Sequence, residues 1–178
     1  MKHQRMLKLD RAFQPCVAED DDEVFLNGIF EFNVTRLLAY IEVHADGFPV
    51  DSIAVAVIHD MGAVNEVAIG NSDLTRPILM AEIAPGRYNV IDGHHRVAKA
   101  RREHVAAIPV RRVPCPEHVA FLTSNRAYAA YVEYWNSKIK EMAPATSRRR
   151  LPDVDHRHIT GSIGDRGARS GVRCVLPS

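Results

Sequence analysis

The clearest periodic pattern lies between residues 34 and 45, where apolar side chains recur at the spacing of one helical face. Asn33 comes directly before them and fits the N-cap position, because its side chain can accept a hydrogen bond from a free backbone N–H group. Asp46-Gly47 is expected to end the helix. The apolar face consists of Val34, Leu37, Leu38 and Ile41. We therefore predict an amphipathic helix that packs on the core.

Residues 78–113 predict the order strand, strand, helix, strand. The segments 78–83 and 87–91 are apolar strands, and Pro85 and Gly86 between them suit the second and third positions of a type II turn. A polar helix over 95–104 and a strand over 107–113 complete the unit. Pro109 lies inside this last strand and favours an edge position or a bulge.

The remaining pattern adds further elements on both sides of this unit. Residues 28–32 predict a short strand, and residues 52–58 are β-branched and apolar, which predicts a buried strand. Residues 59–75 form a long polar connection of the kind that becomes a lid or a binding loop. Two helices are predicted over 117–123 and 126–142. The second carries an apolar face that we expect to pack on the core or on a second subunit, formed by Tyr131, Tyr134, Trp135 and Ile139.

Composition divides the 178 residues into three parts. Residues 1–24 are polar and charged and are expected to form a flexible arm, residues 25–143 an α+β domain, and residues 144–178 a disordered Arg-rich tail. With 46% hydrophobic and 25% charged residues, the chain resembles a soluble globular protein. It has no apolar run long enough for a transmembrane helix and no signal-peptide pattern at its start, so we expect a cytoplasmic protein without membrane insertion.

The net charge of +1 hides an asymmetry between the tail and the body. The tail carries seven Arg and three Asp, which leaves −3 for residues 1–143. A basic tail suggests an anionic partner, although a solvated charged end explains it equally well. The three cysteines Cys16, Cys115 and Cys174 are far apart, so neither a disulfide framework nor a cysteine zinc site is indicated.

The segment from Asp92 to Arg96 joins a strand to a helix and has the composition of a phosphate-binding corner. Free N–H groups at a helix N-terminus attract anions, and Gly93 leaves the backbone open to them. Arg96 can bind phosphate oxygens, and His94 or His95 can donate hydrogen bonds or act as a base. Asp92 can hold Mg²⁺ against two phosphates. The alternative is an ordinary helix cap with surface histidines.

The corner also carries a family resemblance. The sequence V-I-D-G-H-H-R-V-A-K-A followed by I-P-V, with R-P-I-L-M upstream, resembles the signature of the ParB/sulfiredoxin superfamily over about residues 50–113. The resemblance implies a ParB/sulfiredoxin-like mixed sheet with flanking helices, in which residues 92–96 grip nucleotide phosphates at the start of a helix.

A second resemblance covers more of the chain. The segments F-L-N-G-I-F-E-F-N-V-T-R-L-L-A-Y-I-E, I-H-D-M-G-A-V-N-E-V-A-I-G-N-S-D-L-T-R-P-I and A-Y-V-E-Y-W-N resemble plasmid-encoded fertility-inhibition (oncogenic suppression) proteins. This resemblance implies ATP hydrolysis with Mg²⁺, DNA cleavage, and a block on DNA transfer through a type IV secretion system. It also implies secretion or relaxosome proteins as partners.

Two departures from the superfamily limit what the resemblance implies. Sulfiredoxins place their reactive cysteine where this chain has His94, and an imidazole cannot replace a thiolate in that chemistry. Segregation proteins of the ParB type carry a helix-turn-helix domain after this fold, whereas residues 117–142 offer at most two helices. We therefore expect neither activity.

Several residues outside the corner are further candidates. Glu31 lies between two phenylalanines and is a candidate base if it is desolvated, although strand alternation would turn it to solvent. Before the strand at Pro77, the candidates for closing over a nucleotide are Asn71, Asp73 and Arg76. The candidate DNA-binding residues are Lys99, Arg101, Arg102, Arg111 and Arg112, although neighbouring arginines cannot all face one way.

Two hypotheses for function follow from these observations. In the first, the protein is an enzyme that hydrolyses ATP and cleaves DNA, with charge stabilisation by Arg96 and water activation by a histidine. In the second, the corner binds nucleotide or DNA without catalysis, and the protein inhibits transfer by occupying a secretion or relaxosome component. The sequence leaves open whether the protein forms a homodimer.

Overall fold

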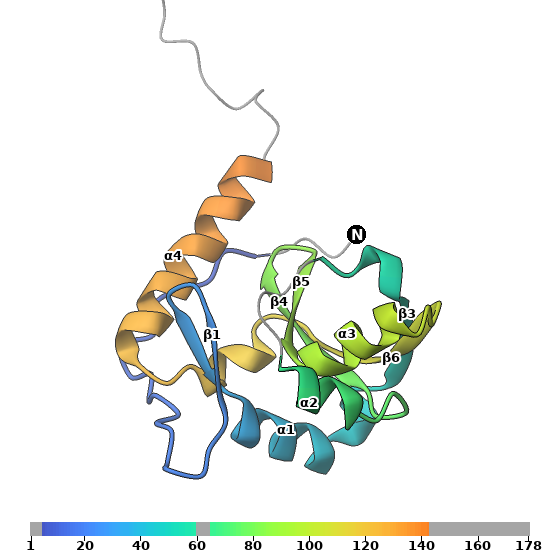
Figure 1. Cartoon of the computed structure of the whole chain (residues 1–178). Coiled ribbons are helices and arrows are strands. Elements are labelled where there is room, and N and C mark those ends of the chain that lie inside the picture. The colour runs from blue at the N-terminus through green and yellow to red at the C-terminus, as the bar shows by residue number, and fades with distance from the viewer. Residues whose placement is uncertain (1–4, 60–64, 143–178) are drawn as a thin grey trace, which may run out of the picture. The chain divides into compact units, whose positions relative to one another are not determined.

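The computed structural model describes residues 5–59 and 65–142, and the predicted Arg-rich tail lies outside these residues (Figure 1). The described chain is a mixed α+β fold, as predicted, with a mixed four-stranded sheet. Between residues 5 and 142, apart from the gap at 60–64, no helix is long and apolar enough to cross a membrane.

The sheet has the order β3-β6-β4-β5. The strands β3 (Val50–Ala54) and β6 (Ala107–Val113) are antiparallel, β6 and β4 (Ile78–Ala84) are parallel, and β4 and β5 (Arg87–Asp92) are antiparallel. Every residue of β4 is buried because β4 lies inside the sheet and both of its faces are covered.

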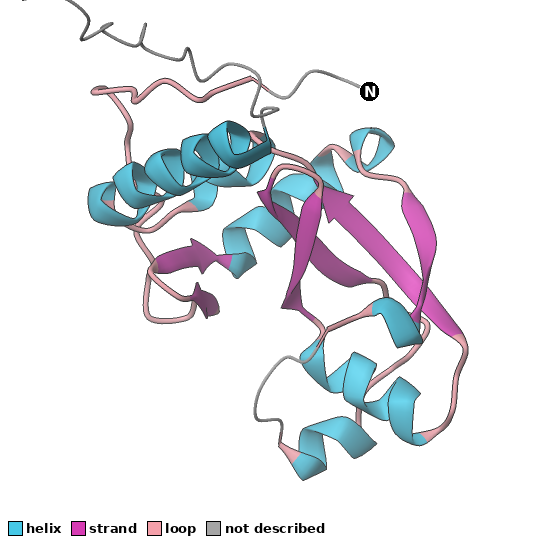
Figure 2. Cartoon of the chain, turned by 90° about the horizontal axis from the view of Figure 1, so that it is seen from above, coloured by secondary structure: helices cyan, strands magenta, loops and turns pink. Residues whose placement is uncertain are grey.

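Two hydrophobic clusters occupy the two faces of this sheet. Figure 2 shows helices on both sides of the sheet. One contains side chains of α1 (Val34–Val43), α4 (Asn125–Met142) and the hairpin of β1 (Val24–Asn27) and β2 (Phe30–Asn33). The other contains side chains of α3 (His94–Arg102). The shorter helices are α2 (Glu66–Gly70), η1 (Ala45–Gly47), η2 (Val55–Val57) and η3 (Glu117–Phe121).

The local signals in α1 and in the β4–β5 turn are confirmed. Asn33 is the N-cap of α1, and its side chain accepts a hydrogen bond of 3.0 Å from the backbone N–H of Arg36. Of the predicted apolar face, Leu38 is only partly buried, and the other three side chains are buried. Gly86 has φ +71°, the positive value that a type II turn requires at its third position.

Residues 5–13, part of the arm that the sequence predicted to be flexible, lie along α4. Asn136 accepts a hydrogen bond of 2.8 Å from the backbone N–H of Leu7 and donates one of 2.9 Å to its carbonyl. Phe13 stacks on Tyr128 with the ring centroids 3.9 Å apart. Tyr131 and Trp135, on the predicted aromatic face, are buried in the core.

The predicted buried strand over 52–58 is wrong in its bounds and in its exposure. The strand β3 covers residues 50–54 and is mostly exposed, because it forms an edge of the sheet, and residues 55–57 turn into η2. Only Val55 and Ile58 of the predicted strand are buried. The predicted polar connection over 59–75 contains α2, and the sequence analysis missed β1.

Pro109 lies in an inner strand, whereas the sequence predicted an edge position or a bulge. It pairs with Ser52 of β3, whereas the parallel ladder between β6 and β4 begins only at Val110. At Pro109 itself, β6 therefore has a partner on one side only, and the missing N–H removes no bond to β4.

Candidate functional site

A cavity of about 190 Å³ lies beside the predicted corner. Its walls come from α1, the start of β4, the end of β5, the first turn of α3 and the middle of β6. The residues that line it are Leu38, Ile41, Glu42, Arg76, Pro77, Ile78, Leu79, Asp92, Arg96 and Arg111. Three guanidinium groups and two carboxylates give this lining a net positive formal charge. We call it the arginine cavity.

Arg96 turns back on Asp92 and Gly93 at the end of β5. Its Nη2 donates a hydrogen bond of 2.7 Å to Asp92 Oδ2, and the side chain is only 13% exposed. Gly93 has φ +96°, and a Cβ added there would meet Arg96 Nη2 at 2.7 Å and Ile78 Cγ2 at 2.7 Å. The glycine therefore provides the space in which the guanidinium of Arg96 lies, rather than the open approach for a phosphate that the sequence suggested.

Arg111 enters the cavity from β6 opposite this corner. In the parallel register it pairs with Leu79, another lining residue, whereas the next residue, Arg112, forms an ion pair with Asp51. The Nε atoms of Arg96 and Arg111 are buried, and within the described chain neither has a hydrogen-bond partner. Guanidinium Nε and Nη groups bind oxyanions in pairs, so two such groups in one cavity are suited to a phosphate or carboxylate.

Of the three loop candidates, only Arg76 reaches the cavity. Asn71 follows α2 as its C-cap, and its backbone N–H bonds to α2 carbonyls. The carboxylate of Asp73 accepts hydrogen bonds from the backbone N–H and hydroxyl of Thr75, at 2.9 and 2.7 Å, and these bonds hold a local turn. These contacts lower the pKa of Asp73.

His94 does not line the cavity. Its ring stacks on Phe25 of β1 with the centroids 5.0 Å apart. Desolvation by these surroundings lowers the pKa of His94, so the imidazole is neutral at neutral pH.

His95 also lies outside the cavity lining. Its Nε2 accepts a hydrogen bond of 3.2 Å from the backbone N–H of Asn65, the N-cap of α2. This contact selects the tautomer with the proton on Nδ1. The predicted corner is therefore divided: Asp92 and Arg96 line the cavity, whereas His94 contacts β1 and His95 contacts α2.

Glu31 shows the alternation that the strand pattern predicted. Phe30 and Phe32 are buried, while Glu31 is half-buried and accepts a hydrogen bond from the hydroxyl of Thr123. No hydrogen bond or ion pair between described residues connects Glu31 with Asp92 or with any cavity arginine. Its geometry fits a structural contact between β2 and the segment before α4.

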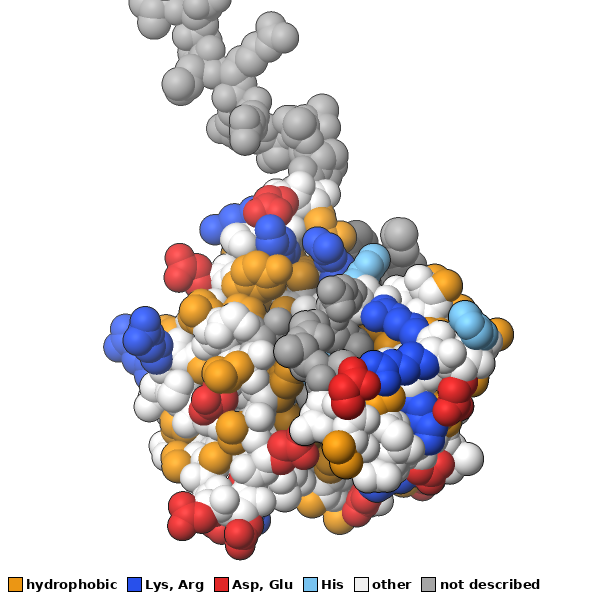
Figure 3. Space-filling view, in the orientation of Figure 1, with side chains coloured by type: hydrophobic (Ala, Val, Ile, Leu, Met, Phe, Trp, Pro, Cys, Tyr) orange, Lys and Arg blue, Asp and Glu red, His pale blue; other side chains and the backbone are white. Residues whose placement is uncertain are grey.

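The predicted DNA-binding residues are mostly engaged in contacts within the chain. Lys99 donates to the carbonyls of Gly70 and Ser72, and Arg101 donates to the carbonyl of Ile58. Arg102 forms two hydrogen bonds of 2.6 Å with Glu66. Figure 3 shows Lys and Arg side chains over α3, next to acidic ones. The expected cluster is therefore partly neutralised at the surface.

Sequence reasoning missed two features of the site. Arg111 was predicted to bind DNA, and no role was predicted for Glu42, which lines the cavity from α1. The signal for Arg111 was present, because alternation along 107–113 turns adjacent arginines to opposite faces of the sheet. No sequence pattern indicated that α1 would form a wall of the site.

The carboxylates of the cavity fit Mg²⁺ only in a phosphate complex. Described residues contain no cluster of three or more His, Cys, Asp or Glu side chains that could hold a metal ion. Mg²⁺ is commonly bound by one or two carboxylates together with substrate phosphates and water. Asp92 and Glu42 could supply such carboxylates, although Asp92 is already paired with Arg96.

Comparisons with protein-family models, with curated proteins and with solved structures found no match.

Proposed function

We propose that the protein binds the phosphates of ATP in the arginine cavity and hydrolyses ATP with Mg²⁺. The observation that carries this proposal is that three arginines, Arg76, Arg96 and Arg111, line one small cavity of net positive charge. Guanidinium groups bind oxyanions through charge-assisted hydrogen bonds, so a phosphate held among these side chains would be strongly stabilised.

The volume of the cavity limits what enters it. Pockets that enclose drug-sized ligands measure about 300–1,000 Å³. A cavity of about 190 Å³ therefore suits phosphate groups, with the nucleoside outside its mouth. Arg76 lines the cavity and is exposed to solvent, so it would bind the outer phosphates.

The residues that line the cavity suggest how hydrolysis would proceed. Arg96 and Arg111 would stabilise the charge that develops on the transferred phosphoryl group. Mg²⁺, held by Asp92 and Glu42 together with the phosphates, would neutralise further charge. A carboxylate of the lining, rather than His94 or His95, would orient the attacking water molecule, because neither histidine lines the cavity.

A binding module without catalysis is the second candidate. The observation that favours it is that both histidines lie away from the cavity lining while Asp92 is engaged by Arg96. In this case, ATP or another phosphate ligand would bind and not be hydrolysed. Measurement of binding and turnover on the same samples separates the two candidates.

The experiment uses two adjacent arginines of β6 as test and control. We expect Arg111→Ala to weaken ATP binding at least tenfold, since a charged hydrogen bond contributes about 1.5–3 kcal/mol. Arg112→Ala removes the same charge one residue away but leaves the cavity intact. The ATP affinity of this variant should therefore stay within about twofold of that of the unchanged protein, because a distant surface charge has a small effect. Calorimetry measures binding, and phosphate release measures turnover. Equal affinities of the two variants would refute the site.

Plasmid fertility inhibition and DNA cleavage are proposals that rest on the sequence resemblance. If they are correct, expression of the protein should reduce transfer of DNA through a conjugative or T-DNA type IV secretion system, and Arg111→Ala should restore it. DNA contact through Lys99, Arg101 or Arg102 would have to replace the contacts that these side chains make within the chain. A variant that binds no ATP and still inhibits transfer would favour contact with a secretion or relaxosome protein.

A further inference from the structure

A second cavity, of about 490 Å³, lies at the C-terminal end of α1, and the proposed function does not use it. Its walls come from the last turn of α1, from η1 and from the segment that begins η3. The described residues that line it include no lysine or arginine, in contrast to the arginine cavity. The lining side chains that carry a ring or a charge are Tyr40, His44, Asp46, Phe48 and Glu117. We call it the acidic cavity.

The C-terminal end of α1 adds partial negative charge to this cavity. The free carbonyl groups at the end of a helix together carry about half a negative charge, which a basic side chain in the last turn commonly offsets. α1 has no basic residue in its last turn. Its last residue, Val43, and its C-cap, His44, both line the cavity. The helix end therefore favours a cation at this place.

Asp46 and Glu117 add two full negative charges, and hydrogen-bonded turns hold both residues. In η1, the backbone N–H of Gly47 donates a hydrogen bond of 2.9 Å to the carbonyl of His44. At the start of η3, the backbone N–H of Glu117 donates one of 3.0 Å to the carbonyl of Pro114. Both acidic residues are exposed, and neither forms an ion pair with another described residue. The cavity therefore holds two carboxylates that the described chain does not neutralise.

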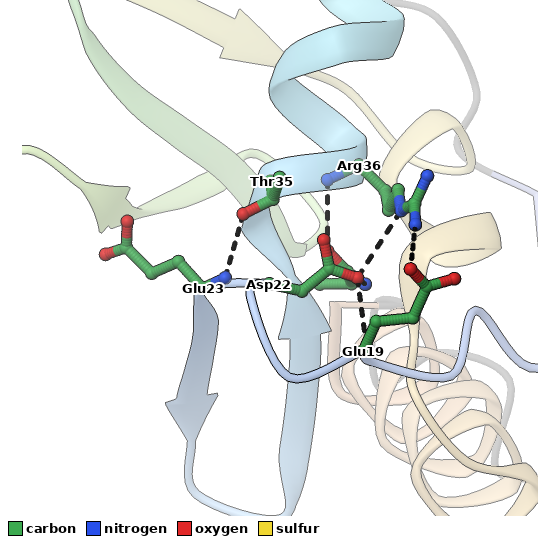
Figure 4. Close-up of polar contacts among 6 residues, drawn as sticks. Glu19, Asp22, Glu23, Thr35 and Arg36 are labelled. Carbon is green, nitrogen blue, oxygen red and sulfur yellow. Dashed lines mark hydrogen bonds and ion pairs between the residues drawn. The ribbon is translucent and has the colours of Figure 1, made fainter.

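The acidic side chains near the other end of α1 are neutralised within the chain (Figure 4). Glu19 and Asp22 both form ion pairs with Arg36, at 3.0 and 3.4 Å. The same helix thus has a guanidinium group beside the carboxylates near its start and none in the last turn at its end. A cation from outside the chain would supply this missing charge in the acidic cavity.

Three rings give the acidic cavity an aromatic wall. The ring centroid of Tyr40 lies 4.2 Å from that of His44 and 5.9 Å from that of Phe48. His44 Nδ1 lies 2.9 Å from the carbonyl of Tyr40, so the neutral imidazole carries its proton on Nδ1 and keeps Nε2 as an acceptor. Rings attract organic cations to their faces, and carboxylates accept hydrogen bonds from them. No group of three or more metal-ligating side chains exists among the described residues, so a bare metal ion fits this cavity less well.

We propose that the acidic cavity binds an organic cation, namely a guanidinium or alkylammonium group. The N–H groups of the cation would donate to Asp46 and Glu117, and its alkyl stem would pack on the rings. A cavity of about 490 Å³ lies within the range of about 300–1,000 Å³ that is usual for small-molecule sites, so the stem fits together with the charged group. The cation belongs either to a basic side chain of a partner protein or to a free polyamine. This site is independent of ATP binding in the arginine cavity.

NMR titration of the full chain with two cations and one neutral compound tests this site. N-acetyl-arginine amide represents a basic side chain, spermidine represents a free polyamine, and N-acetyl-citrulline amide has nearly the shape of the arginine probe without its charge. We expect at least one cation to shift the backbone N–H signals of Asp46, Gly47 and Phe48, whereas the citrulline probe should not. Val67 and Gly70 of α2 do not line the cavity and serve as internal controls. The cation that binds more tightly identifies the source of the ligand.

Two charge variants complete the design. Asp46→Asn combined with Glu117→Gln keeps the shape of the lining and should weaken binding of the cation about tenfold, because its charged hydrogen bonds are lost. Glu19→Gln removes a carboxylate that Arg36 already neutralises and should leave the affinity unchanged. The proposal would be overturned by unshifted signals with both cations, by equal binding of the citrulline probe, or by equal affinity of the double variant and the unchanged protein.

Discussion

The close contact at Gly93 leads to a quantitative prediction for Gly93→Ala. The new Cβ would lie 2.7 Å from Nη2 of Arg96 and 2.7 Å from Cγ2 of Ile78. Arg96 can swing away only by breaking its ion pair with Asp92, and Ile78 is a buried, β-branched side chain with little freedom to rotate. The substitution therefore forces a change in the wall of the arginine cavity.

The expected loss of folding stability has two contributions, and the control substitution Gly86→Ala measures one of them alone. A non-glycine residue in the left-handed region costs about 1–2 kcal/mol. Overpacking of a filled site adds about 1–3 kcal/mol. Gly93→Ala combines both, whereas Gly86→Ala at φ +71° incurs only the first, because nothing lies within 4 Å of its added Cβ.

Urea unfolding followed by circular dichroism measures both variants. Gly93→Ala should lower the free energy of unfolding by about 1–3 kcal/mol more than Gly86→Ala does. It should also weaken ATP binding, because Arg96 loses its position, while Gly86→Ala should leave the affinity unchanged. Equal destabilisation by the two substitutions would show that Arg96 and Ile78 do not pack against Gly93, and this would refute the described position of Arg96 in the cavity wall.

Three further predictions concern the core and the arm. Burial lowers the pKa of His118 to about 4 from 6.5, so the unfolded chain binds a proton before the folded one as pH falls. This group should therefore cost about 3 kcal/mol of stability between about pH 6.5 and 4, and His118→Gln should remove that part of the pH dependence in urea unfolding. Burial raises the pKa of Cys115 to about 11 from 9.0, so alkylation followed by mass spectrometry should show it reacting roughly a hundredfold more slowly than an ordinary thiol near pH 8; a fast reaction would contradict its burial. Asn136→Ala removes two hydrogen bonds to Leu7 and should cost about 1–3 kcal/mol and speed proteolysis of the arm, unless the arm is not held on α4.

The sequence by itself determined the features that depend on neighbouring residues. Asn33 caps α1 because its side chain reaches the free N–H group three residues on, and Gly86 takes the positive φ of its turn because it has no Cβ. The order strand, strand, helix, strand over residues 78–113 also follows from local pattern. For the same reason, the aromatic face of α4 could be expected in the core.

Only the tertiary structure decided which neighbours the side chains of residues 92–96 contact. Asp92, His94, His95 and Arg96 are adjacent in sequence, but successive residues of a helix start point in directions about 100° apart and so have different neighbours. Which neighbour each has depends on β1, α2 and α1, all distant in sequence. In the same way, Arg111 lines a cavity because α1, β4 and β5 supply its other walls, while Arg112 pairs with Asp51 at the surface.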